Sequence, residues 1–256
     1  MKGIASDTLK DSPHYIRREI LAGLARHGYI VDRKPLERPS SDDVLVIWNR
    51  TRSDIFFAER YEAVGAKVIV VENGYIGKDQ ESRQLYAMAL GFHLGAGTWV
   101  EGPTDRWKLL EMTPQPWRAG GREIVVLPQR GIGTPGIAMP LSWPDEVGAR
   151  LRKVTDRPIR VRKHPGRART EPYDELKNAW AAVTWASGAG IKSIFAGVPV
   201  IHELPSWIGA PAARLGLEHL EDPFIGDRMP MLRRLAYAQW TVDEIKAGEP
   251  FHWLLA

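Results

Sequence analysis

The chain has 256 residues, of which 44% are hydrophobic and 26% are charged, and its formal net charge is +4. These values are typical of an ordinary globular protein that is large enough to bury a core. The sequence contains no run of 18 apolar residues, so no membrane span is predicted. The first 15 residues lack the apolar segment of a signal peptide. The absence of cysteine excludes disulfides and thiolate metal sites, so a cytoplasmic protein is expected.

The first half of the chain alternates helical and strand patterns. An apolar stripe with helical spacing predicts a helix over residues 12–29, and a second helix is predicted over residues 53–66. Short, nearly continuous apolar runs predict buried strands over residues 43–49 and 67–74. Together these elements predict a Rossmann-like N-terminal domain over residues 1–117.

The pattern starts again after a Pro- and Gly-rich linker at residues 113–121. Predicted strands and helices then alternate up to residue 203, which indicates a parallel sheet with both faces covered and a second Rossmann-like domain over residues 118–235. Thr241 and Glu244 have the spacing of a capping box, and residues 236–256 are predicted to form a closing helix that packs back towards the N-terminal domain. The expected fold is therefore α/β, with two Rossmann-like domains, parallel sheets and a C-terminal helix.

The turn at Ser187, Gly188, Ala189 and Gly190 lies where a predicted strand becomes a helix. A helix N-terminus exposes unpaired N–H groups and a partial positive charge, and small residues allow an anion to approach them closely. We interpret the turn as a cradle for a phosphate or diphosphate. The alternative is an ordinary strand–helix turn in which Ser187 is only the N-cap.

Further donor-side candidates follow other strands of the second half. Lys163 and His164, in the segment RKHPG, place a charge and a hydrogen-bond donor where ligands bind to parallel sheets. Arg130 lies in RGIGTPG, whose GxGxxG spacing is not followed by the helix that a dinucleotide fold requires, so a nicotinamide dehydrogenase is the least favoured function. Glu203, with His202, follows the last apolar run, where a nucleotide ribose can be held. Each of these residues can instead belong to a surface turn or loop.

In the first half, Glu72 ends a predicted strand and is a candidate general base. His93 is a second acid–base candidate, and Asn73, Gly74 and Trp99 are candidates for holding an acceptor. The alternatives are a salt-bridged or capping Glu72 and a structural His93. No cluster of His, Asp and Glu has metal-ligand spacing, so no metal and no cofactor are expected.

The segment ASGAGIKSIFAGVPVI resembles the donor site of two-domain GT-B glycosyltransferases, with Lys192-Ser193 in place of the usual Glu-Ala. KHPG and Ser187 are similar to the His-Pro and Ser/Thr motifs of bacterial sialyl- and capsule Kdo-type transferases. ENGY is similar to the Glu-Asp-Gly-Phe segment of capsule transferases, with Asn73 in place of the Asp. The resemblance implies a metal-independent transferase with a nucleotide-sugar donor on its C-terminal half and an acceptor on its N-terminal half.

A looser resemblance to phage-encoded proteins covers ENGYIG, FHLGAGTW and the C-terminal tail. It implies a transferase in the host cytoplasm that glycosylates a hydroxymethylated pyrimidine in double-stranded DNA, with the basic residues of segments 150–169 and 228–234 holding phosphates. Two alternatives are a transferase that acts on a surface glycan and a non-catalytic nucleotide- or nucleic-acid-binding protein. The donor sugar, the stereochemistry and the oligomeric state are left open.

Overall fold

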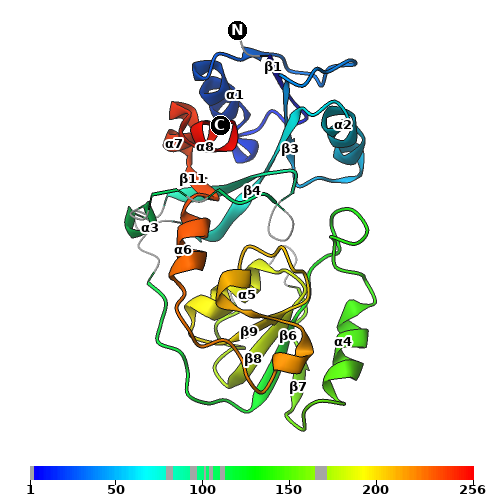
Figure 1. The fold of residues 1–256 in the computed structure, drawn as a ribbon, viewed down its shortest axis with the longest axis vertical. Helices are drawn as coiled ribbons and strands as arrows, with labels where there is room; N and C mark the ends of the chain where they lie inside the picture. The colour runs from blue at the N-terminus through cyan, green and yellow to red at the C-terminus, as the bar shows by residue number, and fades with distance from the viewer. Residues whose placement is uncertain are drawn as a thin grey trace. The chain divides into compact units, whose positions relative to one another are not determined.

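The computed structural model describes residues 3–78, 83–92, 97–100, 102–103, 106–109, 113–164 and 172–256. The chain divides into two compact units, which we call unit 1 and unit 2 (Figure 1). Unit 1 combines Met1–Leu110 with Arg233–Ala256, and unit 2 is the continuous stretch Glu111–Leu232.

Unit 1 contains a six-stranded sheet in the order β11-β5-β4-β3-β1-β2. The parallel part is formed by β1 (Ile4–Asp7), β2 (Ile30–Val31), β3 (Val44–Trp48) and β4 (Lys67–Lys78). Two strands are antiparallel to their neighbours, namely β5 (Gln84–Leu90) on β4 and β11 (Gln239–Thr241) on β5. The predicted strands at 43–49 and 67–74 are confirmed, but the prediction of a purely parallel sheet is wrong for β5 and β11.

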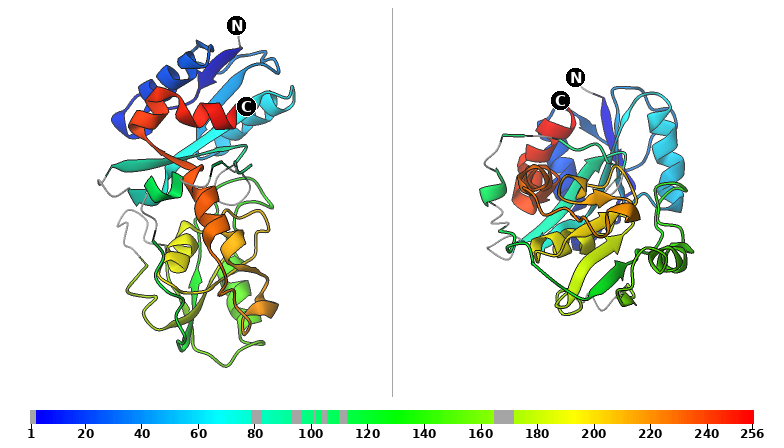
Figure 2. Two further views of the ribbon diagram at one scale, coloured as in Figure 1. Left: turned by 60° about the vertical axis from the view of Figure 1, so that its left-hand side comes forward. Right: turned by 60° about the horizontal axis from the view of Figure 1, so that its bottom comes forward.

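Helices cover both faces of this sheet (Figures 1 and 2). On one face, α2 (Arg52–Glu62) buries Ala58 and Tyr61 against apolar side chains of β3 and β4. The opposite face carries α1 (Arg17–Arg26), α7 (Val242–Ala247) and α8 (Glu249–Leu254), and Figure 2 shows α7 and α8 beside α1. The described residues of unit 1 also form the 3-10 helix η1 (Pro13–Tyr15) and α3 (Arg106–Leu109).

The C-terminal segment is not one closing helix, so that prediction is wrong. Its residues form the strand β11 and then two short helices, which are separated by Gly248 in a left-handed conformation with φ 94°. The predicted capping box is confirmed, because the Thr241 side chain accepts from the Glu244 backbone N–H and the Glu244 side chain accepts from the Thr241 backbone N–H. In α1, Gly23 allows close packing of the tail, since a Cβ there would lie 2.1 Å from the Ile245 carbonyl oxygen.

Unit 2 contains a five-stranded sheet that is parallel throughout, in the order β10-β9-β8-β6-β7. Its strands are β6 (Glu123–Leu127), β7 (Ile159–Val161), β8 (Ala179–Thr184), β9 (Val200–His202) and β10 (Arg214–Leu215). Its helices include α4 (Trp143–Leu151), α5 (Gly188–Phe195), η3 (Ala210–Ala212) and η4 (Leu217–His219), while α6 (Met229–Ala236) runs from unit 2 into unit 1. The parallel sheet predicted for this half is confirmed.

Buried apolar residues pack the helices of unit 2 against its sheet. The inward face of α4 packs Trp143, Val147 and Leu151 against Ile124, Val126 and other fully buried side chains of the sheet. On α5, Ile191 and Ile194 are also completely buried, and this helix contacts β8 and β9. Both faces of the sheet are thus covered by helices.

Candidate functional site

The strand order of unit 2 identifies the edge where a ligand is expected. In chain order the five strands are arranged 2-1-3-4-5, so the direction in which strands are added reverses between β6 and β8. In open α/β sheets, ligands bind outside the carboxyl ends of the strands at such a switch point. The residues that follow β6, β7 and β8 were predicted as separate candidates. They therefore belong to one edge of one sheet.

A hydrogen-bond frame joins the carboxyl ends of β6 and β8. The Thr184 hydroxyl donates to the Leu127 carbonyl at 3.0 Å and accepts from the Ser187 backbone N–H at 3.0 Å. Gln129 holds Ala186 from both sides, because its amide nitrogen donates to the Ala186 carbonyl at 3.2 Å and its amide oxygen accepts from the Ala186 N–H at 3.0 Å. Gln129 was not predicted as part of the site, although a polar residue two positions after an apolar strand could have indicated it.

Within this frame, α5 begins at the predicted anion-binding turn. Ser187 is the N-cap, and its side-chain oxygen accepts from the Ala189 backbone N–H at 3.1 Å. A Cβ on Gly190 would lie 2.9 Å from the Trp207 ring and 3.0 Å from Thr184 Cγ2, so packing explains this glycine. A Cβ on Gly188 would have no neighbour within 4 Å. Open space therefore lies beside the first residue of α5, at the positive end of the helix.

Positive charge gathers on the neighbouring strand ends. Arg130, which follows β6, and Lys163 and His164, which follow β7, are all exposed. Desolvation of the covered part of the ring, and then the charges of Arg130 and Arg162, lower the pKa of His164 from its ordinary value. This shift favours the uncharged form of the His164 ring at neutral pH. Pro165 and Gly166 of the same motif lie outside the described residues.

Glu203 and His202 differ from these residues because their polar atoms are engaged within unit 2. One carboxylate oxygen of Glu203 accepts from the Trp143 indole N–H at 2.5 Å, and the other lies 2.6 Å from the Arg150 guanidinium. His202 is 2% exposed, its Nδ1 contacts the Leu204 carbonyl at 3.0 Å, and burial lowers its pKa. The structure thus connects Glu203 to α4, and its role towards a ribose stays a prediction.

In unit 1, Glu72 lies just beyond the end of β3, on the longer strand β4. Asn49, with its amide oriented so that the nitrogen faces Glu72, donates to both carboxylate oxygens at 3.0 Å. Neighbouring residues of a strand point to opposite faces, so Asn73, which pairs with Tyr86, leaves the sheet on the other side from Glu72. The described strand therefore joins Glu72 to Asn49 and does not bring the side chains of Glu72 and Asn73 together.

The remaining acceptor-side candidates are distributed around the same strand. Gly74 is needed for packing, because a Cβ there would lie 2.6 Å from the Leu85 Cβ. The ring of Trp99 is partly buried and contacts Tyr75 edge-on, with 6.4 Å between ring centroids. His93 lies outside the described residues. The catalytic and binding roles of all these residues remain predictions.

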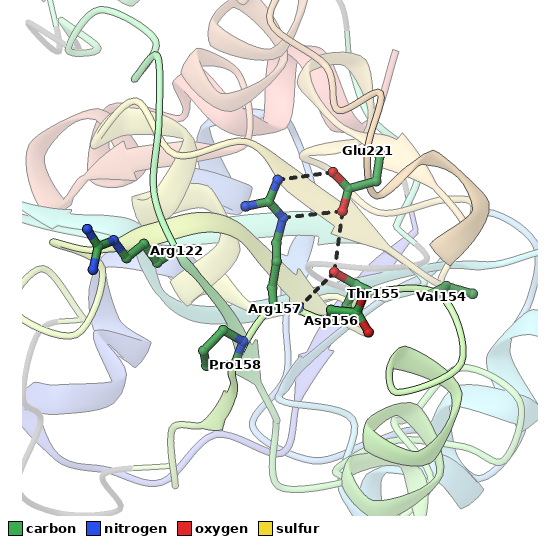
Figure 3. A pocket seen from close by; sticks show the side chains of 7 residues that line it. All are labelled: Arg122, Val154, Thr155, Asp156, Arg157, Pro158 and Glu221. Carbon is green, nitrogen blue, oxygen red and sulfur yellow. Dashed lines mark hydrogen bonds and ion pairs between the residues drawn. The ribbon is translucent and has the colours of Figure 1, made fainter.

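A separate hollow of about 590 Å³ lies at the amino-terminal edge of the unit 2 sheet, opposite to the switch point (Figure 3). Figure 3 shows the Arg157 guanidinium turned towards Glu221, with N···O distances of 3.2 and 3.1 Å, while Arg122 points away from this pair. The hollow is open and its central charges neutralise one another. It is therefore a weaker candidate site than the carboxyl edge.

Carboxylates pair with part of the basic segment at 150–169. Among its described residues, four arginines form ion pairs, namely Arg150 with Glu203, Arg157 with Glu221, Arg160 with Glu123 and Arg162 with Glu175. Arg228 donates to the backbone carbonyls of Gln115 and Ile194. Among the described helices none combines the length and apolar character needed to cross a membrane, and the described His, Asp and Glu residues form no group of three that could hold a metal ion.

Comparison with known proteins adds a likeness in fold. No protein-family model and no curated protein matches the chain in sequence. The chain is similar to the beta Kdo 2,7 transferase structure of Thermosulfurimonas dismutans KpsC, with 13% identity and a TM-score of 0.55 over 97% of this chain and 98% of that one. It is also similar to the beta Kdo 2,4 transferase structure of the same protein, with 17% identity and a TM-score of 0.54 over 95% and 98%. As a matter of fold, the predicted resemblance to capsule Kdo-type transferases is confirmed.

Proposed function

We propose that this protein is a glycosyltransferase that moves a sugar from a nucleotide-activated donor to an acceptor hydroxyl. The observation that carries the proposal is the carboxyl edge of the unit 2 sheet. At its switch point, open space beside Gly188 meets the positive end of α5, and Arg130, Lys163 and His164 follow the adjacent strands. A site of this kind suits the phosphate groups of a nucleotide. The likeness in fold to two Kdo transferase structures supports the same activity.

On the donor side, each group has a distinct part. The backbone amides at residues 188–190 bind phosphate oxygens, and the Ser187 hydroxyl hydrogen remains available as a further donor because its oxygen already caps the helix. When the bond between the anomeric carbon and the phosphate oxygen breaks, its electron pair goes to the leaving nucleotide. Arg130 and Lys163 stabilise that developing charge and the uncharged His164 ring donates a hydrogen bond, so positive charge comes from the protein without a metal ion.

On the acceptor side, we propose Glu72 as the general base. It takes the proton from the acceptor hydroxyl as that oxygen bonds to the anomeric carbon. His93 is the second candidate for this proton transfer, and Asn73, Gly74 and Trp99 are candidates for contacts with the acceptor. Glu203 contributes to donor binding indirectly, through its bonds to Trp143 and Arg150.

We propose a glycan hydroxyl as the first candidate for the acceptor. A hydroxymethylated pyrimidine in DNA is the second candidate. A DNA duplex requires a surface of unpaired cations that can displace counterions from phosphates. Among the described residues of the segment predicted for that contact, four arginines already have carboxylate partners, namely Arg150, Arg157, Arg160 and Arg162. A DNA acceptor remains the second candidate because of the looser phage resemblance.

A two-stage experiment tests the proposal. First, calorimetry against cytidine, uridine, guanosine and thymidine mono- and diphosphates should find selective binding of one nucleotide. Second, nucleotide release from the matching sugar nucleotides is measured with oligosaccharide and hydroxymethylated-DNA acceptors. Turnover that requires one acceptor class and is lost in Glu72→Gln is expected. Binding without turnover would indicate a non-catalytic nucleotide-binding protein, and no binding across the panel would refute the proposal.

A further inference from the structure

The end of β3 contains a hydrogen-bonded chain of three side chains, Trp48, Asn49 and Glu72. The indole N–H of Trp48 donates to the Asn49 amide oxygen at 3.1 Å, and the Asn49 amide nitrogen donates to both Glu72 oxygens at 3.0 Å. An indole N–H can only donate, so it requires the amide oxygen to face Trp48. The amide nitrogen must then face Glu72, and Trp48 thereby fixes the direction in which Asn49 acts.

The backbone at this corner is held in an unfavourable conformation. Asn49 has φ 65° and the next residue, Arg50, has φ 29°, which is the left-handed region that non-glycine residues rarely occupy. The Arg50 guanidinium, 5% exposed, bonds both oxygens of Glu62 at 2.6 and 2.8 Å and the Gly91 carbonyl at 2.9 Å. These contacts compensate the strain, and strained residues that are kept in place by their surroundings concentrate at functional sites.

The Trp48 ring is itself held by neighbouring rings. Its centroid lies 4.9 Å from that of Tyr15, 5.0 Å from that of His14 and 6.3 Å from that of Tyr86. The contacts with Tyr15 and Tyr86 are edge-on and the contact with His14 is tilted, and together they restrict the orientation of the Trp48 side chain. The position of the indole N–H is therefore set by η1 and β5 as well as by β3. Because this N–H donates to the Asn49 amide oxygen, the same contacts also fix the orientation of the Asn49 amide.

We propose that Asn49, oriented by Trp48, is the positioning residue for Glu72. The inference rests on the proposed function, in which Glu72 accepts the proton of the acceptor hydroxyl. The contact of the Asn49 amide nitrogen with both carboxylate oxygens restricts the rotation of the carboxylate. An acceptor hydroxyl then meets a base whose orientation does not have to be established during the reaction. Neither Trp48 nor Asn49 needs to touch the substrate for this effect.

Three variants separate positioning from structural support. Asn49→Asp keeps the shape and the tolerance for left-handed backbone but replaces the donor by a negative oxygen, and Asn49→Gly relieves the strain while removing the amide. Trp48→Phe removes the N–H together with part of the ring, and the control Trp180→Phe makes the same change in size. Matched controls lie in unit 2, where the Asn178 amide donates to a Glu123 oxygen at 3.2 Å and the Trp180 indole donates to the Leu220 carbonyl at 3.1 Å. Asn178→Asp and Trp180→Phe remove comparable hydrogen bonds far along the chain from Glu72.

Steady-state kinetics of the full chain with its donor and acceptor give the main readout. We expect kcat to fall by about tenfold to a hundredfold in Asn49→Asp and Asn49→Gly, and by about threefold to tenfold in Trp48→Phe, with the KM for the donor unchanged. In a Glu72→Gln background the same substitutions should have no further effect on kcat. The control variants should keep the kcat of the unmodified chain.

The outcomes distinguish this inference from the proposed function. If Glu72→Gln is inactive but folded Asn49→Asp and Trp48→Phe keep full kcat, the positioning role is wrong while the proposed function stands. If Glu72→Gln keeps full activity, Glu72 is not the base and the positioning role is wrong, while the transferase activity stands. If the unmodified chain transfers no sugar, both are wrong. As a readout independent of turnover, the Trp48 indole N–H resonance should shift in Asn49→Gly but not in Asn178→Asp, and an unchanged resonance would refute the hydrogen-bonded chain.

Discussion

One substitution at Gly188 should raise the stability of unit 2 and at the same time weaken nucleotide binding. It is the first residue of α5, it has no positive φ, and a Cβ there meets nothing within 4 Å, so a larger residue fits without strain. An aspartate at the start of a helix interacts favourably with the helix dipole, and Gly188→Asp should therefore stabilise unit 2 by about 0.3–1 kcal/mol. If a phosphate binds at this helix start, the same carboxylate should weaken nucleotide binding.

The size of the binding loss follows from the charge. Two unit charges 4 Å apart at a protein surface interact by about 4 kcal/mol, which is the upper limit for repulsion between the carboxylate introduced by Gly188→Asp and a bound phosphate. With screening and side-chain movement, a loss of roughly 1.4–4 kcal/mol is expected, which is about tenfold to a thousandfold in Kd. Gly188→Asn has nearly the same shape without the charge, so its affinity should fall far less.

Isothermal titration calorimetry gives the affinities, and thermal unfolding of the same samples gives the stabilities. Gly148 provides a matched control, because it lies inside α4 and a Cβ there also meets nothing within 4 Å. Gly148→Ala should raise stability by about 0.5–1 kcal/mol and leave nucleotide binding unchanged. Equal loss of affinity in Gly188→Asp and Gly188→Asn would show that shape, not charge, matters, and unchanged affinity in both would refute an anion site at the start of α5.

Three further predictions concern stability. Burial lowers the pKa of His202, so on acidification this residue takes up a proton at a higher pH in the unfolded chain than in the folded protein. The free energy of unfolding should therefore fall as pH drops below about 6.5, and His202→Gln should make this fall less steep. An equally steep fall in the variant would contradict this. Gly74→Ala should lower the free energy of urea unfolding by about 1–3 kcal/mol because of the contact with Leu85, and an unchanged midpoint would show that the strand yields freely. Burial alone would raise the pKa of Glu244, but hydrogen bonds and charge from Arg106 lower it. Arg106→Gln should therefore reduce the free energy of unfolding by roughly 1–3 kcal/mol at pH 7, and by progressively less below about pH 4.3. Urea unfolding at both pH values measures this loss, and a loss that does not change with pH would exclude the ion pair as its cause.

The elements that could be predicted from sequence are those whose signal is local. Continuous apolar runs such as residues 43–49 and 67–74 are sufficient to indicate buried parallel strands, and both form. The strand β1 was not predicted, because Ser6 and Asp7 are polar and yet fully buried. Their partners are distant in sequence, since Ser6 Oγ lies 2.5 Å from the Tyr61 hydroxyl and Asp7 pairs with Arg17. Such compensation cannot be recognised from a local pattern.

The same limit applies to β11 and to Glu203. Gln239–Thr241 lies in a segment with helical character, and it becomes a strand because it pairs with β5, about 150 residues earlier in the chain. Glu203 follows an apolar strand just as Ser187 does, so sequence alone treats both as ligand contacts. Only the fold shows that Trp143 and Arg150 already occupy its carboxylate. The grouping of His164 and Ser187 at one edge was predictable, because both residues follow strands of one parallel sheet.

The division of the chain also affects how the protein is made. Unit 2 is one continuous stretch, whereas unit 1 is built from two stretches separated by all of unit 2. A ribosome therefore releases every residue of unit 2 before it releases β11, α7 and α8, which complete the sheet edge and the helical layer of unit 1. The half that is translated first is accordingly the half that finishes folding last, and until then its β5 edge is available for pairing with other nascent chains.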